Sequence, residues 1–323
     1  MKEKKWIYPV LISLLLLLLP LITRQNYYVL HIAIICSIFS ILAIGLNILQ
    51  GYAGLVSIGQ AGFYAIGAYI AGLLAVKLGL GFWICILISS LVTSLVGLGL
   101  GLTTVRLYGG YLALVTVGFG RIVQLVAVNW TNLTGGGEGL LGIPSAKVGS
   151  HVLSQTGYYY VCIFIVALVF LFTGNVINSK TGRAFIAMRE QRIAASMMGI
   201  DIAKYRLIAF VIAAFYSGIA GSLYGFFAGS LFPDYFNLSQ SVTILIMVVL
   251  GGSGTKYGPI IGAILVTIGF EVLRPFQSYQ MIIYGIGIVL VVMFMPSGLS
   301  GLIQRLAKVI KIRKKGDTHA AAD

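Results

Sequence analysis

The segment Asn47-Ile-Leu-Gln-Gly-Tyr-Ala-Gly-Leu-Val-Ser-Ile-Gly-Gln-Ala-Gly-Phe63 joins two long apolar runs, residues 27–49 and 60–77. Each run is close to the about 20 apolar residues that a helix needs to cross a bilayer. Residues 51–59 between the runs are too rich in glycine for an ordinary helix. Broken backbone at membrane depth is tolerated only where it is buried in protein or lines a wet cavity. We therefore predict an all-α polytopic membrane protein in which glycine-rich segments break some of the helices.

The composition indicates the same class of protein. Of the 323 residues, 59% are hydrophobic and only 9% are charged, and the mean hydropathy is +1.00. A soluble domain carries roughly 25% charged residues, so this chain has too little polar surface to cover a globule in water. Cys36, Cys85 and Cys162 all lie inside apolar runs. We interpret them as buried small hydrophobes rather than as disulfide partners or metal ligands.

The apolar runs predict about ten transmembrane helices, with the N- and C-termini in the cytoplasm. Residues 1–26 form an N-terminal anchor helix, because no small-residue cleavage site follows the first apolar run. Residues 27–300 form the transmembrane domain. Residues 301–323 form a basic cytoplasmic tail, and the apolar residues that lead into it suit membrane lipids with anionic headgroups. The predicted spans are residues 6–23, 27–49, 60–77, 82–105, 109–130, 157–178, 207–229, 241–255, 259–275 and 279–297.

The formal net charge of +14 reflects topology rather than nucleic acid binding. Most Lys and Arg residues fall in loops that the predicted topology places in the cytoplasm, and only Arg24, Lys77, Lys147 and Arg274 fall on the outer side. This distribution is the positive-inside bias of membrane proteins. It predicts an outer loop at residues 131–156 and a long cytoplasmic loop at residues 179–206.

The sequence lacks the motifs of a catalytic chain. It contains no G-x-x-x-x-G-K-[ST], no H-E-x-x-H and no G-x-S-x-G. We therefore expect a non-catalytic chain without its own cofactor or metal site. Glu271 is the one carboxylate inside a predicted span, three residues before Arg274. A local ion pair is favoured there over a proton relay, and a relay would make the chain a self-sufficient secondary carrier.

The cytoplasmic loop carries an unusual apolar pattern. A short amphipathic helix is predicted over residues 184–198, with Phe185, Met188, Ile193 and Met197 on one side. Apolar faces rich in methionine suit a groove that must repack as its shape changes. We interpret this helix as one that lies in a groove of a partner protein, and a solvated connector is the alternative.

Within this loop, Ala194-Ala195 followed by three residues and Gly199 resembles the EAA-x-x-x-G loop of ABC importer permeases, with Ile193 in place of the leading Glu. From about residue 30 to residue 300, the chain resembles the branched-chain amino acid ABC permeases of the LivM type. Where many members carry Glu after Gly-Phe-Gly, this chain has Arg121. The matching blocks, in the family's order, are residues 46–63, 111–120, 134–143, 182–200 and 250–263.

The resemblance implies a permease subunit in a prokaryotic cytoplasmic (inner) membrane. Its partners would be a second homologous permease, two cytoplasmic ABC ATPases that bind ATP and Mg²⁺, and an extracytoplasmic solute-binding protein. The implied solutes are amino acids, most directly branched-chain or hydrophobic ones. Close relatives carry urea, amides or aromatic acids, which stay open as alternatives.

The candidate functional residues form three groups. For the polar residues around the glycine-rich breaks, a role in the translocation pathway is favoured over simple packing. The first break is at 51–59, and a second lies about 200 residues later, at 251–258, as expected of two gates in opposite halves. Arg121 either faces this pathway or pairs with a partner subunit. The group in the translocation pathway is Asn47, Gln50, Ser57, Gln60, Arg121 and Gln124. The ATPase-coupling group is Gly182, Arg183, Ala184, Phe185, Met188, Arg189, Glu190, Ala194, Ala195 and Gly199. The outer-loop group, expected to receive solute from the binding protein, is Gly135, Gly136, Gly137 and Glu138.

Overall fold

The computed structural model describes residue 20, residues 26–148, residues 151–274 and residue 285. Apart from one short β-ladder, the regular structure in these residues is helical. Six helices are long and apolar enough to cross a membrane, judged by length and composition. They are α2 (Tyr27–Leu46) with its continuation η1 (Asn47–Tyr52), α3 (Gln60–Leu78), α4 (Phe82–Thr104), α5 (Gly110–Asn129), α7 (Gln155–Asn178) and α10 (Ile202–Ala228). The shorter elements are α6 (Thr131–Thr134), η2 (Gly136–Glu138), β1 (Lys147–Val148), β2 (His151–Val152), α8 (Lys180–Glu190), α9 (Arg192–Met197), η3 (Pro233–Phe236), α11 (Leu238–Gly251) and α12 (Gly258–Val272).

The prediction of about ten spans is confirmed only in part. The predicted spans 241–255 and 259–275 correspond to α11 and α12, which have 14 and 15 residues. Each is shorter than the about 20 residues that a single crossing needs. The spans 6–23 and 279–297 lie outside the described residues except for Pro20 and Gly285, and the tail at 301–323 lies wholly outside them. The topology of the termini is therefore not tested.

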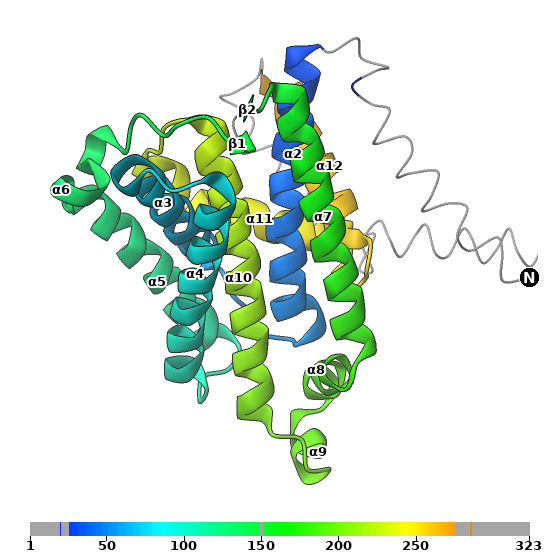
Figure 1. Ribbon diagram of the computed structural model, residues 1–323. Helices are drawn as coiled ribbons and strands as arrows, with labels where there is room; N and C mark the ends of the chain where they lie inside the picture. The colour runs from blue at the N-terminus through cyan, green and yellow to red at the C-terminus, as the bar shows by residue number, and fades with distance from the viewer. Residues whose placement is uncertain (1–19, 21–25, 149–150, 275–284, 286–323) are drawn as a thin grey trace, which may run out of the picture.

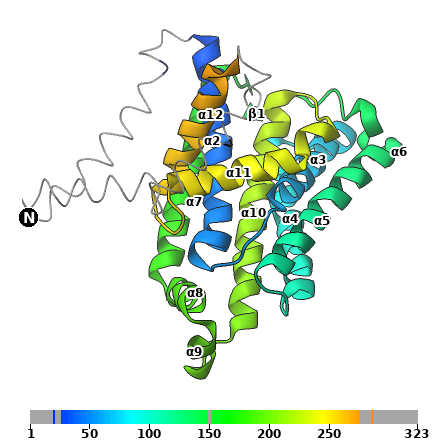
Figure 2. The same ribbon diagram turned by 180° about the vertical axis from the view of Figure 1, so that it is seen from behind.

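The helices form a bundle with two distinct ends. In Figure 1, α2, α7 and α10 run along the length of the bundle, and α3, α4 and α5 lie to one side of them. The segments α8 and α9 project at one end, whereas α6, β1 and β2 lie at the other. Figure 2 shows α11 crossing the bundle at a steep angle and α12 turning back beside α2. The predicted cytoplasmic and outer loops thus lie at opposite ends of the molecule.

The centre of the bundle is α10, which packs between α3 and α4 through small side chains. A Cβ atom added at Gly218 would lie 2.6 Å from the Cα of Ser90 on α4, and one added at Gly67 on α3 would lie 2.6 Å from the Cα of Gly218. Such close contact of backbones is typical of membrane helices, which gain little from burying apolar surface against one another. By contrast, most residues of α5 and α7 are not buried within the protein, so these two helices lie at the outside of the bundle.

The first break follows from the end of α2. The helix begins after Asn26, whose side chain accepts a hydrogen bond from the backbone N–H of Tyr28 at 3.1 Å. From Asn47 to Tyr52 the backbone widens into a π-helix, and residues 54–59 have no regular structure. The predicted absence of an ordinary helix at 51–59 is confirmed. π-Helical turns inside apolar helices are rare and occur mostly at functional sites.

The contact at Gly218 gives a direct test of the packing. Gly218→Ala places a methyl group against the backbone of α4, so we expect a loss of about 1–3 kcal/mol in the free energy of unfolding. Gly99→Ala is the matched control, because Gly99 lies on α4 with no heavy atom near its missing Cβ. In that open position alanine favours the helix by up to about 1 kcal/mol. The measurement is the midpoint of thermal unfolding in detergent, and equal midpoints for the two variants would contradict the packing described.

Candidate functional site

The predicted coupling loop is folded as two helices. α8 begins at Lys180, because the side chain of Ser179 accepts a hydrogen bond from the N–H of Thr181. It ends at Gln191, which is extended (φ −146°, ψ 95°), and α9 follows directly. The prediction of a single helix over 184–198 is therefore wrong. Residues 202–206 of the predicted loop belong instead to α10, which is capped by the side chain of Asp201.

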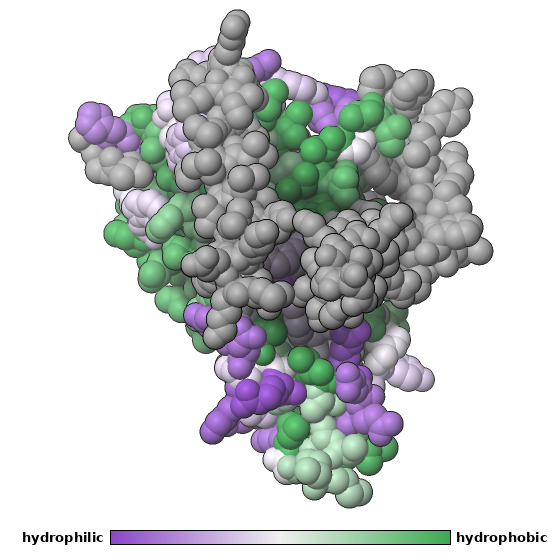
Figure 3. Space-filling view, turned by 90° about the vertical axis from the view of Figure 1, so that its right-hand side faces the viewer, coloured by the Kyte–Doolittle hydropathy of each residue, from purple (hydrophilic) through white to green (hydrophobic). Residues whose placement is uncertain are grey.

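The bend at Gln191 divides the predicted apolar face. Phe185 and Met188 on α8 are buried inside the protein, so they are not part of an exposed face as the sequence pattern predicted. On α9 and just after it, Ile193, Met197 and Met198 are 70%, 82% and 83% exposed. Figure 3 shows this apolar tip at the bottom of the molecule, with hydrophilic side chains around and above it. On α8, Ile186 is 40% exposed, so most but not all of the exposed apolar surface of the segment belongs to α9 and its end, which we call the α9 tip (Ile193, Met197 and Met198).

The remaining residues of the coupling group occupy different environments. Arg183 and Glu190 are exposed, and Arg183 makes a local contact of 3.5 Å with the backbone carbonyl of Asn178. Gly199 ends the segment in a left-handed conformation, with φ +80°. The members that pack against the rest of the protein are Gly182, Ala184, Phe185, Met188 and Ala195, and Ala194 is exposed.

A buried arginine that the sequence analysis missed anchors the start of α10. Arg206 is 1% exposed and donates hydrogen bonds to the backbone carbonyls of Val105 at 2.7 Å and Leu107 at 2.5 Å. A third hydrogen bond goes to the carbonyl of Thr104 at 3.2 Å. These carbonyls belong to the end of α4 and its connection to α5, so Arg206 fixes α10 to the connection that precedes α5.

The aromatic ring of Tyr108 extends this contact to the coupling segment. The guanidinium carbon of Arg206 lies 4.4 Å from the centre of the ring, and that of Arg192, on α9, lies 3.5 Å from it. Tyr108 therefore contacts two cations, one from α9 and one from α10. In the sequence, the sign of this cluster is an arginine at the start of an apolar run. The positive-inside bias already accounts for an arginine at that position, so the cluster was not predicted.

The structure brings the two glycine-rich breaks together. The side-chain amide of Asn47, which is 2% exposed, donates to the carbonyl of Thr255 at 3.0 Å and accepts from the N–H of Gly254 at 2.8 Å. Asn47 lies in η1, and both partners lie in the turn between α11 and α12. The breaks that the sequence places about 200 residues apart are thus neighbours.

The other predicted pathway residues lie in separate places. Gln60 donates from Nε2 to the hydroxyl of Ser217 at 2.7 Å, inside the contact of α3 with α10. The Oε1 atom of Gln50 and the hydroxyl of Ser57 are buried and have no hydrogen-bond partner among the described residues. Among the described residues, none of these three side chains forms a hydrogen bond with Asn47.

Arg121 and Gln124 line a cavity of about 380 Å³. Arg121 donates from Nη1 to Oε1 of Gln124 at 2.6 Å, one turn along α5. The cavity lies between α5, the start of α3 and the start of α11, with Ile58 and Ser241 in its wall. A cation and an amide on an apolar helix thus face a hollow, which is where polar groups in membrane proteins meet solute or water.

The outer loop is tied to the end of α10. Leu140 and Leu231 form a backbone bridge with N···O distances of 2.8 and 2.9 Å. Gly135 and Gly136 have positive φ angles and turn the chain between α6 and η2. Gly137 has open space around its missing Cβ, and Glu138 is exposed. The predicted outer-loop residues therefore form a structured turn at the end opposite α8 and α9.

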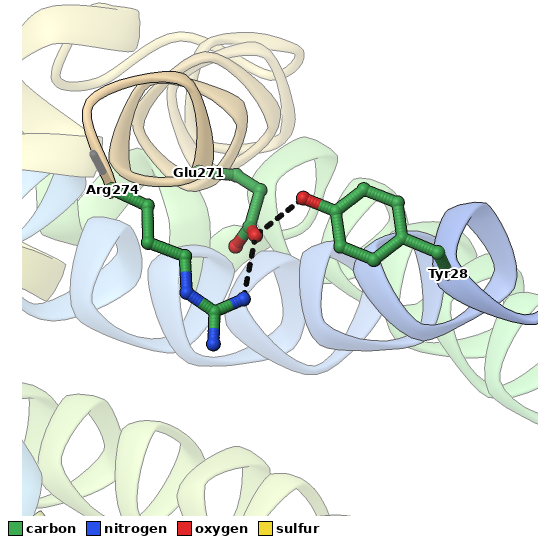
Figure 4. A network of polar contacts seen from close by, with 3 residues as sticks. All are labelled: Tyr28, Glu271 and Arg274. Carbon is green, nitrogen blue, oxygen red and sulfur yellow. Dashed lines mark hydrogen bonds and ion pairs between the residues drawn. The ribbon is translucent and has the colours of Figure 1, made fainter.

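Glu271 takes part in a local ion pair. Its Oε1 atom accepts hydrogen bonds from the hydroxyl of Tyr28 on α2 at 2.5 Å and from Nη1 of Arg274 at 3.0 Å (Figure 4). The three residues line a cavity of about 1130 Å³ between α2, α11 and α12. The local ion pair that the sequence favoured is present, and the hydrogen bond from Tyr28 joins the end of α12 to the N-terminal end of α2.

Comparisons with known proteins give a consistent result. Residues 28–292 match the sequence profile of a family described as branched-chain amino acid transport system, permease component. The chain is 34% identical to the high-affinity branched-chain amino acid transport system permease protein LivM of Escherichia coli K12, over 88% of this chain and 73% of that protein. It is 25% identical to the LivH permease protein of the same organism, over 82% of this chain and 92% of that protein. The probable LivM protein of Methanocaldococcus jannaschii is 24% identical over 81% of this chain and 90% of that protein. No solved structure matches the chain.

The role of Arg206 can be tested by Arg206→Met. Methionine fills similar space but leaves buried carbonyls without a donor, so we expect a loss of about 3 kcal/mol in the free energy of unfolding. Lys204→Met is the control, because Lys204 is exposed two residues away on the same helix. Thermal unfolding in detergent measures both variants. Equal stability of Arg206→Met and the unmodified protein would show that the buried hydrogen bonds do not anchor α10.

Proposed function

We propose that this chain, which belongs to the family of branched-chain amino acid transport system permease components, forms part of the membrane pathway of an ABC importer for branched-chain or hydrophobic amino acids. It is a multi-pass membrane protein, and six helices among the residues that the structure describes are long and apolar enough to cross a bilayer. The observation that carries the proposal is the α9 tip, an exposed apolar surface at one end of such a bundle. An apolar surface of this kind needs a protein partner when it lies outside the membrane.

The α8–α9 end is assigned to the cytoplasm, where two ABC ATPases would dock on the α9 tip. Basic residues gather at this end, among them Lys180, Arg183, Arg192 and Lys204, in agreement with a cytoplasmic location. The ATPases would supply the sites for ATP and Mg²⁺. The proposed location is the inner, cytoplasmic membrane of a prokaryote.

The opposite end is assigned to the outer side, where the turn at Gly135–Gly137 would meet an extracytoplasmic solute-binding protein. A second, homologous permease would pack beside α5, since most of that helix is not buried within this chain. The cavity at Arg121 and Gln124 lies against this exposed helix. We assign it to the edge of the pathway, where the cation of Arg121 suits the carboxylate of an amino acid.

Docking on the α9 tip is tested by the double substitution Ile193→Glu with Met197→Glu. In the docked complex, two carboxylates would lie where apolar side chains contribute about 1.5–3 kcal/mol each. We therefore expect at least a tenfold loss of co-purified ATPase and of ATP-driven uptake. Leu141→Glu is the control for ATPase co-purification, because Leu141 is 57% exposed in the loop at the other end, away from the proposed ATPase contact. Retention of both ATPase and uptake by the double variant would reject docking at this tip.

The transport class is tested in proteoliposomes. The chain reconstituted with its second permease, ATPases and binding protein is expected to accumulate leucine, isoleucine or valine only when ATP is present. The chain alone, given a proton or sodium gradient and no ATP, is expected to accumulate none. Accumulation by the chain alone would establish a secondary carrier instead. Parallel assays with urea, acetamide and phenylalanine decide among the alternative solutes.

A further inference from the structure

Arg189 is a residue of the α8–α9 segment that forms a hydrogen bond to the first membrane helix that the structure describes. It lies in the last turn of α8, and its Nη1 atom donates a hydrogen bond to the backbone carbonyl of Gly51 in η1. Much of the side chain is exposed, but the end that makes this contact is partly buried. The contact joins residues 138 positions apart in the sequence.

The position of Gly51 explains why a cation binds there. Gly51 lies at the C-terminal end of the continuous helix Tyr27–Tyr52, whose last carbonyls have no partner within the helix. A positive charge is favoured beside these carbonyls, because the helix dipole is negative at this end. Among the described residues, the one ion pair is that of Glu271 and Arg274. Arg189 is therefore held by the end of a helix rather than by a carboxylate.

The second glycine-rich break, in the turn between α11 and α12, also lies against Arg189 and Gly51. A Cβ atom added at Gly254, in the turn between α11 and α12, would overlap the guanidinium group of Arg189 and lie 2.9 Å from the carbonyl oxygen of Gly51. The N–H of Gly254 donates to Oδ1 of Asn47 at 2.8 Å, so the turn is also bound to η1 directly. Three segments thus meet at one place, which we call the Arg189 junction (Asn47, Gly51, Arg189, Gly254 and Thr255).

The Arg189 junction connects segments of the bundle whose backbone is not regular α-helix. η1 is a π-helix that ends in irregular backbone, and Gly252 and Gly254 have φ angles of +115° and +75°. Hinges are residues at the ends of elements that absorb changes in φ and ψ. Arg189 connects α8 to the end of η1, and Asn47 connects η1 to the turn between α11 and α12.

We propose that Arg189 is a positioning residue that transmits movement of the coupling segment to both glycine-rich breaks at once. The α9 tip receives the ATPase, and Arg189, across the bend at Gln191, carries the movement to η1 and to the α11–α12 turn. This inference rests on the proposed function. It assigns Arg189 to transmission within the chain, whereas the tip residues bind the partner.

The test is Arg189→Met in the complete transporter, reconstituted with its binding protein. Methionine keeps an unbranched apolar stem but removes the donor to Gly51. We expect ATPase co-purification and ATP hydrolysis to persist, while solute taken up per ATP hydrolysed falls about tenfold, as for loss of one hydrogen bond from a charged donor. Arg189→Lys keeps a cation and a donor and is expected to restore most of the ratio.

Lys180→Met is the matched control. Lys180 lies at the start of the same helix, is exposed and does not belong to the predicted ATPase-coupling group. Its ratio of uptake to hydrolysis is expected to equal that of the unmodified transporter. The inference is overturned if Arg189→Met also keeps this ratio, or if Lys180→Met loses as much. Absence of ATP-driven uptake by the unmodified complex would instead reject the proposed function, and this inference with it.

A distance measurement decides the case in which Arg189→Met fails to assemble. Spin labels at Arg183→Cys and Tyr257→Cys, both exposed positions, report the separation of α8 from the α11–α12 turn. With Arg189 in place, we expect the distance distribution to stay the same in the nucleotide-free and ATP-bound transporter, because the two segments move together. A nucleotide-dependent change in that distance would overturn the inference.

Discussion

The side-chain amide of Asn47 satisfies backbone groups that two interrupted helices cannot satisfy themselves. In hydrocarbon, an unpaired N–H or C=O costs several kcal/mol, so a helix break is stable only when other groups bind its free ends. Asn47 is suited to this because an amide both donates and accepts. It donates to the carbonyl of Thr255 and accepts from the N–H of Gly254. The position of α11 and α12 against α2 depends on this pairing.

The α8–α9 segment contacts the bundle on both sides of the bend at Gln191. On α8, Arg189 binds the end of η1, and on α9, Arg192 packs against the ring of Tyr108. Tyr108 and Arg206 lie next to the start of α5, the helix that carries Arg121. In both cases arginine binds backbone carbonyls or a ring rather than an acidic side chain. A chain with 8 acidic and 22 basic side chains offers few carboxylates, so backbone oxygen takes their place.

Much of this organisation was accessible from the sequence, because hydropathy and glycine content report directly on what a bilayer permits. The membrane class and the break after Asn47 followed from those patterns. The bend at Gln191 and the burial of Phe185 did not follow, since helical periodicity shows which residues share a face and not what covers that face. The three carbonyls that bind Arg206 lie about 100 residues earlier in the chain, so no local pattern indicates them. The predicted spans 241–255 and 259–275 are the two shortest of the ten, so the sequence already indicated the short lengths of α11 and α12.

The shortness of α11 and α12 has a consequence for biogenesis. Asn47 is synthesised 207 residues before its partner Gly254, and neither α11 nor α12 is long enough to hold a transmembrane position alone. The hydrogen bonds of Asn47 to this turn can therefore form only after α11 and the start of α12 have been synthesised. Until then, the amide of Asn47 lacks these two partners, and an unpaired polar group is costly in hydrocarbon. A chain that ends before α11 leaves Asn47 in that state.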